Sequence, residues 1–411
     1  MNMKLRNIPF SPPDITEEEI QAVADVLRSG WITTGPRTKL LENNIATMCH
    51  TNRAICLNSA TACMESALRL LGIGKGDEVI VPAYTYTATA SVVAHVGATI
   101  IMLDSQTDNV QMDYEKLEQA ITERTKIIIP VDLAGIPCDY NKIFDIINRK
   151  KNLFQANNSL QEAYGRIIVL ADAAHALGAS RDGKMVGEIA DFTSFSFHAV
   201  KNLTTAEGGA LTWRNHSFVD DDQIYHQLQL LSLHGQDKDA LAKTKSGGWE
   251  YDIVAPYYKC NMTDVAAAMG LVELGRYDSE ILPRRRSIFE QYAAAFAGDS
   301  RFEVPEFATK DKTTSYHVFA LRLARATEAQ RDAVMQAIFE QEVAVNVHYI
   351  PLPMLTAYKQ RGYHIDGYPV AYDNYAREIS LPVYYDLTDE QVAQVIAAVK
   401  TAVDKVFGNR G

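Results

Sequence analysis

Two short motifs contain the residues of this sequence that are best suited to covalent chemistry. Lys201 lies in the stretch Ser196–Asn202, and Asp172 lies upstream in the stretch Ala171–His175. A lysine amine can form a Schiff base with an aldehyde, and an aspartate can pair with a protonated ring nitrogen. Short segments of hydroxyl residues and glycine can hold a phosphate. A cofactor with an aldehyde, a pyridine ring and a phosphate meets all of these demands, and that cofactor is pyridoxal phosphate (PLP).

Each of these residues also has a purely structural interpretation. Asp172 follows an apolar run, where an unpaired carboxylate is costly, but backbone amides or an arginine could satisfy it as well as a pyridine nitrogen. A ring cation about 4 Å away would attract Asp172 by about 4 kcal/mol at an effective dielectric constant near 20. Desolvation of Lys201 would lower its pKa and make it a nucleophile, whereas the alternative is a surface lysine. His175 could hydrogen-bond Asp172 or the ring, or could be an ordinary core histidine, and Gly208–Gly209 could admit a cofactor or only form a turn.

Two further motifs could hold the phosphate and the ring. Ser59, Ala60 and Thr61 join a predicted strand to a predicted helix, and the first turn of a helix offers unpaired N–H groups to a phosphate. The alternative is that Ser59 or Thr61 only caps the helix, which stabilises it by about 1 kcal/mol. Tyr86 follows the next predicted strand and could stack on a pyridine ring, with a gain of about 0.5–1.5 kcal/mol. Packing in the core or at its rim is the alternative for this tyrosine.

Strand-like runs alternate with helical patterns through the first two-thirds of the chain. The predicted strands are 53–57, 78–81, 98–103, 127–131, 167–171, 192–197 and 209–213, and the predicted helices are 62–71, 87–96, 113–121 and 139–149. This alternation predicts a largely parallel sheet that is covered by helices on both faces. Ligands of such sheets bind beyond the carboxyl ends of the strands. Asp172, the turn at 58–61 and the segment 196–201 each follow a predicted strand, so we expect them to converge.

The pattern changes from about residue 263. Here the sequence predicts helices at 264–274, 284–296, 328–341 and 389–406, and strands at 317–323 and 343–347. We interpret residues 1–260 as a large PLP-binding domain with an amino-terminal segment, and residues 261–411 as a small α+β domain. The polar stretch 152–165 is interpreted as a surface excursion.

Composition limits the possible classes of protein. The chain has 411 residues, of which 47% are hydrophobic, enough for a sizeable core and for two or three domains. No apolar run approaches the roughly 18 residues needed to cross a bilayer, and the first residues lack an apolar signal core. Five dispersed cysteines without a C-x-x-C pair favour reduced thiols in the cytoplasm over disulfides or a metal site. The net charge of −11 argues against a nucleic-acid partner, and an anionic substrate would need local basic groups.

Taken together, the motifs resemble the DegT/DnrJ type of PLP-dependent nucleotide-sugar aminotransferases, which belong to the aspartate aminotransferase superfamily (fold type I). The resemblance spans nearly the whole chain. It is carried by residues 29–36, 58–62, 82–89, 172–175, 196–201, 257–264, 315–319 and 348–349. The fold that it implies is α/β, with a mainly parallel seven-stranded sheet between helices in the large domain and a smaller carboxyl-terminal α+β domain.

The resemblance also implies roles for individual residues. Lys201, Asp172 and His175 would be catalytic. The implied cofactor-binding residues are Ser59, Ala60, Thr61, Tyr86, Asp172, His175, Ser196, Lys201, Lys259 and Asn261. The implied substrate-binding residues are Thr33, Thr34, His317, His348 and Tyr349. Some relatives have histidine in place of the lysine and perform dehydration, so Lys201 favours transamination.

The segment Tyr257–Asp264 departs from the commoner family form G-Y-N-Y-R-M, with Lys259 where asparagine is usual. It is similar to the branch of the UDP-4-amino-4-deoxy-L-arabinose aminotransferase. In the family this segment reaches the phosphate of the neighbouring subunit's cofactor. The resemblance therefore implies a homodimer with shared active sites.

The expected activity is the transfer of an amino group from L-glutamate, which leaves 2-oxoglutarate, to a keto group of a nucleotide-linked sugar. The 4-keto position is expected, and the amino sugar would serve surface polysaccharide or related biosynthesis in the cytoplasm. Two alternatives remain: another fold type I enzyme that acts on amino acids, such as a desulfurase, or a non-catalytic regulator that binds PLP or a sugar. No cysteine lies in an obvious mobile glycine- or serine-rich loop, which argues against a desulfurase, and the retained Lys201 argues against the regulator. Neither a nucleic acid nor a membrane is expected as a partner.

Overall fold

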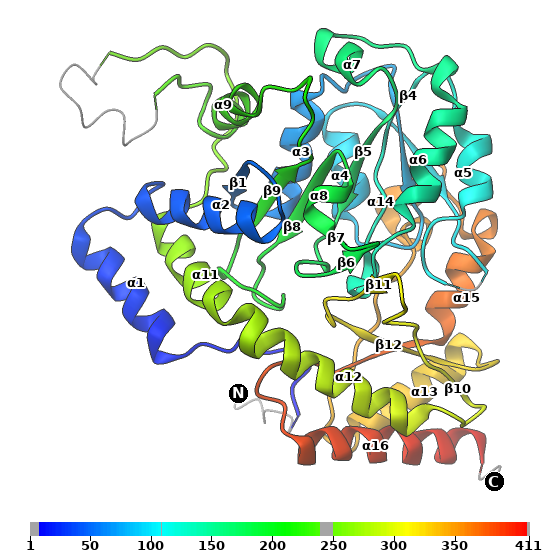
Figure 1. The fold of residues 1–411 in the computed structure, drawn as a ribbon. Helices are drawn as coiled ribbons and strands as arrows, with labels where there is room; N and C mark the ends of the chain where they lie inside the picture. The colour runs from blue at the N-terminus through cyan, green and yellow to red at the C-terminus, as the bar shows by residue number, and fades with distance from the viewer. Residues whose placement is uncertain (1–7, 108, 239–249, 409–411) are drawn as a thin grey trace.

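The structure is a computed structural model that describes residues 8–107, 109–238 and 250–408. Its centre is a sheet of seven strands in the order β1-β9-β8-β5-β4-β2-β3 (Figure 1). These strands are β1 (Ala54–Leu57), β2 (Glu78–Pro82), β3 (Thr99–Leu103), β4 (Thr125–Ile128), β5 (Ile168–Asp172), β8 (Phe192–Ser196) and β9 (Gly209–Trp213). Only β9 runs antiparallel to its neighbours in this sheet, so the predicted mainly parallel seven-stranded sheet is confirmed.

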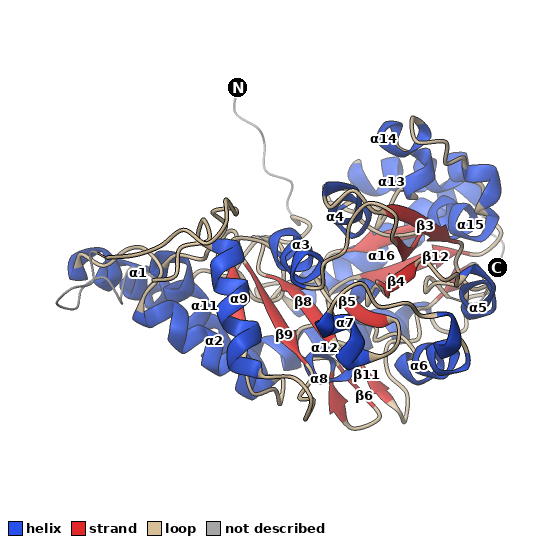
Figure 2. Cartoon of the chain, turned by 90° about the horizontal axis from the view of Figure 1, so that it is seen from above, coloured by secondary structure: helices blue, strands red, loops and turns tan. Residues whose placement is uncertain are grey.

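Helices cover both faces of this sheet, as Figure 2 shows. Successive side chains of a strand point to opposite faces, and β2 illustrates the result. Val79 and Val81 belong to the apolar cluster that contains residues of α3 (Ala60–Leu70) and α4 (Ala88–His95). Ile80 belongs instead to the cluster of α5 (Tyr114–Ala120) and α6 (Tyr140–Arg149). Burial on both faces explains why the sequence of these strands is continuously apolar.

A separate, three-stranded antiparallel sheet and three helices form what we call the small lobe. Its strands are β10 (Phe302–Glu303), β12 (Phe319–Leu323) and β13 (Glu378–Leu381), and its helices are α12 (Leu282–Phe296), α13 (Glu328–Phe339) and α16 (Asp389–Phe407). These elements share one apolar cluster. Figure 1 shows α12, α13 and α16 together on one side of the central sheet. The domain boundary near residue 260 stays a prediction.

The remaining elements surround these two bodies. The helices are α1 (Glu17–Ser29), α2 (Pro36–Met48), α7 (Ser159–Tyr164), α8 (Val186–Ile189), α9 (Asp221–Ser232), α11 (Asp264–Arg276), α14 (Thr356–Lys359) and α15 (Pro369–Arg377). Short 3₁₀ turns lie at Leu133–Gly135, Lys151–Leu153, Leu352–Met354 and Ile365–Gly367, and a π-helical turn lies at Tyr277–Ile281. A ribbon of β6 (Ser180–Arg181), β7 (Lys184–Met185) and β11 (Lys312–Thr313) joins the body of the central sheet to the segment that leads into the small lobe.

The predicted strand at 343–347 is wrong. Among the described residues, Val343 pairs with Ile8 alone and Asn346 with Ser380 alone, so the segment makes isolated bridges there in place of a continuous ladder. The two bridges have different partners because the chain passes from Ile8 in the amino-terminal segment to Ser380 in β13. The segment thereby delivers the residues that follow it toward the central sheet.

The sequence led to two predictions, that no segment crosses a membrane and that the first residues lack a signal core. Within the described residues, no helix combines the length and the apolar character that a bilayer crossing requires. Residues 1–7, on which the prediction about a signal core partly depends, lie outside the described residues.

Candidate active site

A cavity of about 470 Å³ lies at the carboxyl ends of β5 and β8, at the edge of the sheet where the motifs were expected to converge. Ten of the residues singled out from the sequence line it. They are Ser59, Ala60, Thr61, Tyr86, Asp172, His175, Ser196, Lys201, His348 and Tyr349. We call it the reaction cavity. The predicted convergence of the three motifs is therefore confirmed, whereas the roles of the individual residues stay predictions.

Lys201 lies in the loop between β8 and β9, and hydrogen bonds hold the ends of this loop together. The N–H of Phe197 donates to the carbonyl of Gly208 at 2.8 Å, and the N–H of Thr205 donates to the carbonyl of Phe197 at 2.9 Å. Burial lowers the pKa of Lys201 to about 8, and the negative charge of Asp172 partly opposes this shift. The loop therefore presents, inside the cavity, an amine that loses its proton more easily than an exposed lysine.

Asp172 ends β5 and is only 5% exposed. One carboxylate oxygen accepts the hydroxyl proton of Thr89 at 2.7 Å, and the other accepts the N–H of Ala174 at 3.2 Å. Burial raises the pKa of Asp172, while these hydrogen bonds and the charge of Lys201 act to lower it. The structural alternative of a nearby arginine is not found, because the described partners of this carboxylate are Thr89 and Ala174.

Ser59 caps α3, which begins two residues earlier than the sequence predicted. Its Oγ accepts the N–H of Ala62 at 3.1 Å, so the capping alternative is confirmed. Capping leaves other N–H groups of this first turn free to face the cavity. Gly209 packs against the same turn, since a Cβ atom at Gly209 would lie 2.5 Å from the backbone nitrogen of Ala60. The glycine pair thus provides close packing of β9 against the turn, while Gly208 lines the cavity.

His175 does not hydrogen-bond Asp172. The N–H of Ala134 donates to its Nδ1 at 3.2 Å, so the neutral ring carries its proton on Nε2. That nitrogen lies 3.0 Å from the hydroxyl oxygen of Tyr349, which accepts the proton. Burial lowers the pKa of His175 well below the usual range, with the charge of Lys201 acting in the same direction. His175 is thus held neutral at the wall of the cavity.

Tyr86 and Tyr349 form an aromatic corner of the reaction cavity. Their ring centroids are 5.5 Å apart, with an angle of 45° between the ring planes. Tyr86 is 57% exposed, so one face of its ring has room for a flat ligand. Burial raises the pKa of Tyr349 above its usual range, and this hydroxyl therefore stays protonated at neutral pH.

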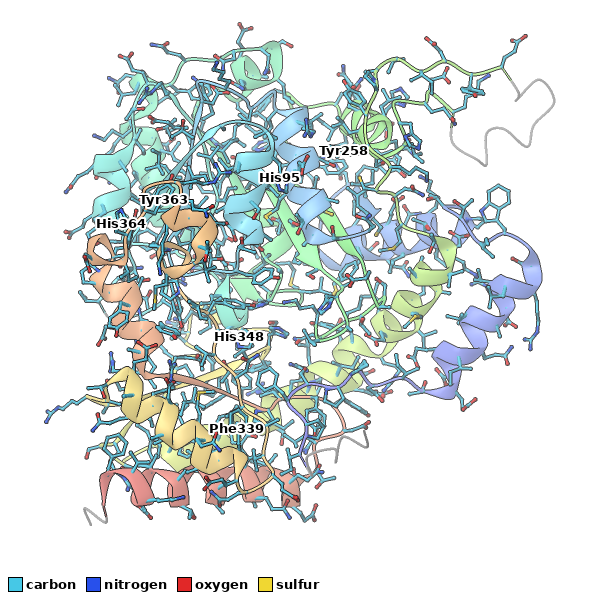
Figure 3. The ribbon with its side chains drawn as sticks, turned by 180° about the vertical axis from the view of Figure 1, so that it is seen from behind. His95, Tyr258, Phe339, His348, Tyr363 and His364 are labelled. Atoms are coloured by element: carbon cyan, nitrogen blue, oxygen red, sulfur yellow. The ribbon has the colours of Figure 1, made fainter. Side chains whose placement is uncertain are left out.

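Two further histidines lie close to this corner. His317 contacts His175 with a centroid distance of 4.3 Å, and its Nδ1 lies 2.7 Å from the amide oxygen of Asn202. It lines a smaller cavity that also touches Lys201, rather than the reaction cavity itself. His348 lines both of these cavities, and Figure 3 shows it at the level where the small lobe meets the body of the central sheet.

Besides His317, four of the residues singled out from the sequence lie outside the reaction cavity: Thr33, Thr34, Lys259 and Asn261. Three of them form a cluster of their own. The Lys259 amine donates to the amide oxygen of Asn261, whose amide nitrogen donates to the hydroxyl of Thr34. Asn261 also pairs with Leu57 at the end of β1. The cluster therefore lies beside the strand that leads into the turn at Ser59, and its residues do not line the cavity that holds Lys201.

Sequence reasoning missed several residues of the site. Thr89 hydrogen-bonds Asp172 from the first turn of α4, and Asp132 lines the cavity with its carboxyl fully buried. Tyr140 and the backbone of Cys138 donate to Asp132 at 2.7 Å each, and burial raises its pKa to about 7. Thr89 lies in the segment 82–89 that carries the family resemblance. A threonine at the start of a helix that follows a strand is a signal from which it could have been predicted. Asp132 directly follows the predicted strand 127–131, which was a similar signal.

The residues of the cavity fit PLP. The space is large enough for a flat ring with a phosphate, and it brings a lysine amine and a buried carboxylate to the same wall. The capped turn at Ser59 offers backbone N–H groups for a phosphate, and the exposed ring of Tyr86 offers a stacking surface. Each chemical feature of the cofactor therefore has a partner in the cavity.

Comparison with known proteins agrees with this geometry. Residues 13–400 match the DegT/DnrJ/EryC1/StrS aminotransferase family. The chain is similar to the spore coat polysaccharide biosynthesis protein SpsC of Bacillus subtilis, with 36% identity over 96% of this chain and 97% of that protein.

Solved structures give the same result. The PMP-form of the putative sugar aminotransferase Spr1654 from Streptococcus pneumoniae has a TM-score of 0.95 and 53% identity, covering 97% of this chain and 100% of that chain. Helicobacter pylori PseC, an aminotransferase involved in the biosynthesis of pseudoaminic acid, has a TM-score of 0.83 and 25% identity, covering 97% and 99% of the two chains. The chain therefore belongs to the DegT/DnrJ/EryC1/StrS aminotransferase family. It is a PLP-dependent aminotransferase of fold type I.

Proposed function

We propose that this enzyme transfers an amino group from L-glutamate to the 4-keto group of a nucleotide-linked sugar, and that Lys201 performs the chemistry. The observation that carries the proposal is the arrangement of Lys201 and Asp172 on one cavity that fits PLP. The likeness to Spr1654, described as a putative sugar aminotransferase, supports a sugar as the amino acceptor. The likeness to SpsC, described as a spore coat polysaccharide biosynthesis protein, supports a place in polysaccharide biosynthesis, which we propose takes place in the cytoplasm.

The bound cofactor supplies an aldehyde that takes up amino groups and a pyridine ring that delocalises the electrons of a broken C–H bond. Asp172 would hold a proton on the ring nitrogen, and the hydrogen bond from Thr89 restrains its carboxylate. Ser59, Ala60, Thr61 and Ser196 would bind the phosphate, and the Tyr86 ring would stack on the pyridine. These residues fix the position of the ring relative to Lys201.

Lys201 acts as the anchor and as the acid–base group. Its amine would hold the cofactor's aldehyde, and once free it would take the proton from the Cα of the amino substrate. The same amine would return a proton on the cofactor side, and water would then release 2-oxoglutarate, so that the amino group stays behind for the keto sugar. A pKa of about 8 suits both directions of this proton movement near neutral pH. The keto sugar undergoes the same steps in reverse order.

Two assignments concern larger parts of the molecule. We infer a homodimer in which Lys259 and Asn261 reach the phosphate of the partner's cofactor, because these side chains lie outside their own chain's reaction cavity. Thr33 and Thr34 belong to the same surface and would contact the sugar nucleotide together with His317, His348 and Tyr349. The similarity of the segment 257–264 to the arabinose branch stays a prediction.

Substitution of Lys201 tests the proposal. Purified wild-type protein loaded with PLP should show a visible absorbance band, and Lys201→Ala should lack this band and fail to transfer amino groups. A panel of nucleotide keto-sugars, assayed with glutamate and mass spectrometry, should show an amino product with the wild type. An unchanged band in Lys201→Ala would assign the anchoring role to another residue. If 2-oxo acids are aminated and no keto sugar is, the alternative of an enzyme that acts on amino acids is correct.

A further inference from the structure

A buried carboxyl group in the small lobe connects to the reaction cavity through two side chains. Glu378 is 1% exposed and begins β13, and Ser380 lies two residues further on the same face of the strand. The Oγ atom of Ser380 lies 2.5 Å from Oε1 of Glu378 and 2.7 Å from Nδ1 of His348. The three side chains thus form a continuous chain of hydrogen bonds that ends at the histidine beside Lys201.

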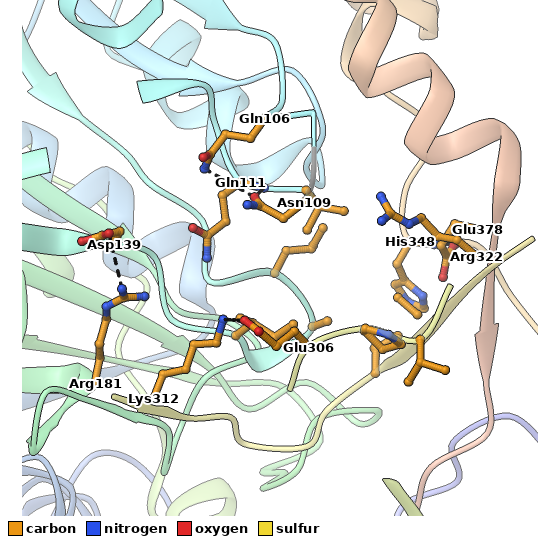
Figure 4. A pocket seen from close by; sticks show the side chains of 18 of the residues that line it. Gln106, Asn109, Gln111, Asp139, Arg181, Glu306, Lys312, Arg322, His348 and Glu378 are labelled. Carbon is orange, nitrogen blue, oxygen red and sulfur yellow. Dashed lines mark hydrogen bonds and ion pairs between the residues drawn. The ribbon is translucent and has the colours of Figure 1, made fainter. Parts of the chain in front are cut away.

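This series of hydrogen bonds connects two cavities. Glu378 lines a second cavity of about 390 Å³, which Figure 4 shows together with Arg322 and His348, and it does not line the reaction cavity. His348 lines both. A proton on Glu378 can therefore reach the reaction cavity from the carboxyl through Ser380 and His348. Among the described residues, Nε2 of His348 has no hydrogen-bond partner, so it is free to face a ligand.

One carboxyl oxygen of Glu378 keeps the same hydrogen bond in both protonation states, whereas the other can either accept or donate a hydrogen bond. Oε2 accepts the backbone N–H of His348 at 2.9 Å, whether or not the carboxyl is protonated. Oε1 can either accept the hydroxyl proton of Ser380 or, when protonated, donate to Ser380. In the first case His348 must carry its proton on Nδ1, and in the second case on Nε2. The protonation state of Glu378 therefore sets the tautomer of His348.

We propose that Glu378, Ser380 and His348 form a one-proton store for the aminotransferase, which delivers a proton to the reaction cavity at Nε2 of His348 and takes it back there. The inference depends on the proposed function for the identity of the group that exchanges the proton. On delivery, Nε2 of His348 gives its proton to the neutral amine of Lys201, which lines the same cavities, Nδ1 receives the proton of Ser380, and Ser380 receives the proton of Glu378. Glu378 ends as a carboxylate, and the reverse sequence restores the starting state.

The charges around Glu378 are consistent with such a store. The titratable and charged groups that face it are Arg322 on β12, Arg331 on α13, Tyr84 after β2, and His348 and Tyr349. Burial raises the pKa of Glu378 to about 8, although Arg331 and the hydrogen bonds from Ser380 and His348 act in the opposite direction. Burial also lowers the pKa of His348 to about 3, with the charge of Lys201 in the same direction. The stored proton therefore remains on the carboxyl, and the histidine passes it on without becoming a cation.

The tautomer of His348 gives a test that needs neither cofactor nor sugar. Proteins labelled with ¹⁵N-histidine are compared by NMR on both sides of pH 8, with the His348 signals identified from H348Q. We expect wild-type His348 to carry its proton on Nε2 below pH 8 and on Nδ1 above it, following Glu378. In Glu378→Gln the amide NH₂ donates to Ser380 at every pH, so His348 should keep its proton on Nε2 throughout. A wild-type tautomer that does not change with pH would overturn the proposal.

The second measurement is the turnover number, kcat, of the enzyme. Glu378→Gln should lower kcat by about tenfold, which is less than the loss of about 10²-fold or more expected for a group that transfers the proton directly to substrate. The matched control is Glu303→Gln, because Glu303 and Glu378 lie opposite Arg322 in register on its two sides, and Glu303 touches neither His348 nor the reaction cavity. This control should retain wild-type kcat and the wild-type tautomer change. An unaltered kcat in Glu378→Gln would also overturn the proposal.

Ser380→Ala serves if Glu378→Gln does not fold. This substitution removes the hydroxyl between Glu378 and His348 while the carboxyl stays in place. The tautomer of His348 should therefore no longer change when the pH passes through about 8, and kcat should fall to a similar extent. A tautomer that still follows Glu378 in this variant would contradict the relay. If no keto sugar is aminated by the wild type, the proposed function fails, while the NMR measurement still decides whether the proton store exists.

Discussion

Two influences act in opposite directions on the amine of Lys201. Burial lowers its pKa to about 8, and the negative charge of Asp172 limits the decrease. We expect the rate at which cofactor-free protein combines with PLP to rise with pH and to level off above about 8, because only the neutral amine attacks the aldehyde. An exposed lysine would show a rise that continues to about 10.4. Stopped-flow absorbance at a series of pH values measures this profile.

The variant Asp172→Asn provides the control for this profile. Removal of the carboxylate charge takes away the influence that raises the pKa of Lys201, so the plateau should begin at lower pH than in the wild type. A plateau that moves to higher pH would show that Asp172 acts on Lys201 in another way.

The reactive residues of the site could be predicted because each is a distinctive type at the end of a predicted strand. Asp172 and Lys201 are examples, and both line the reaction cavity. Glu378 could not be predicted, because its significance depends on His348, which approaches from a segment thirty residues earlier through a turn of the chain. The partners of His175 were missed for the same reason, since the tertiary fold brings them together.

At the scale of elements, the contact of β9 with the start of α3 fixes the turn proposed to bind phosphate. In Gly209→Ala, the new Cβ would lie 2.5 Å from the nitrogen of Ala60 and 2.7 Å from the carbonyl oxygen of Phe195, so the backbone must move. We expect the free energy of unfolding to fall by roughly 1–3 kcal/mol and the affinity for PLP to decrease. Denaturant titration and equilibrium absorbance titration measure the two effects.

Gly275→Ala is the matched control for this prediction. Gly275 lies near the end of α11, is exposed, and has no atom within 4 Å of its expected Cβ. Alanine should leave PLP affinity unchanged and should raise the free energy of unfolding by up to roughly 1 kcal/mol, because it favours the helix. Equal losses in both variants would mean that the close contact of Gly209 with Ala60 is unimportant.

Elements with strong periodicity were predicted within a few residues of their observed ends. The helix predicted at 389–406 is observed as Asp389–Phe407, where Thr388 caps its start. The strand predicted at 343–347 failed because apolar residues there contact two different partners in place of one ladder. Local pattern reports burial reliably, but it does not report which neighbouring strand is available for pairing.

At the scale of the whole molecule, a shared active site can be tested by mixing two inactive variants. Lys201→Ala lacks the amine, and Asn261→Ala would lack the proposed contact with the partner's cofactor. Random reassembly of a dimer should produce mixed dimers with one intact site each, and about a quarter of wild-type activity should return. Activity measured before and after reversible dissociation gives the answer. No recovery, despite mixed dimers seen by native mass spectrometry, would place Asn261 outside the partner's site.

The ribbon of β6, β7 and β11 has a mechanical consequence. Lys312 pairs with Arg181 and Thr313 with Ser180, and the N–H of Asp182 donates to the carbonyl of Asp311 at 2.6 Å. Main-chain bonds thereby fasten the segment before β12 to the hairpin that follows β5. When substrates enter and products leave, the small lobe cannot swing away as a free body. Any displacement of the small lobe relative to the central sheet would therefore be smallest at this ribbon and largest in the elements remote from it.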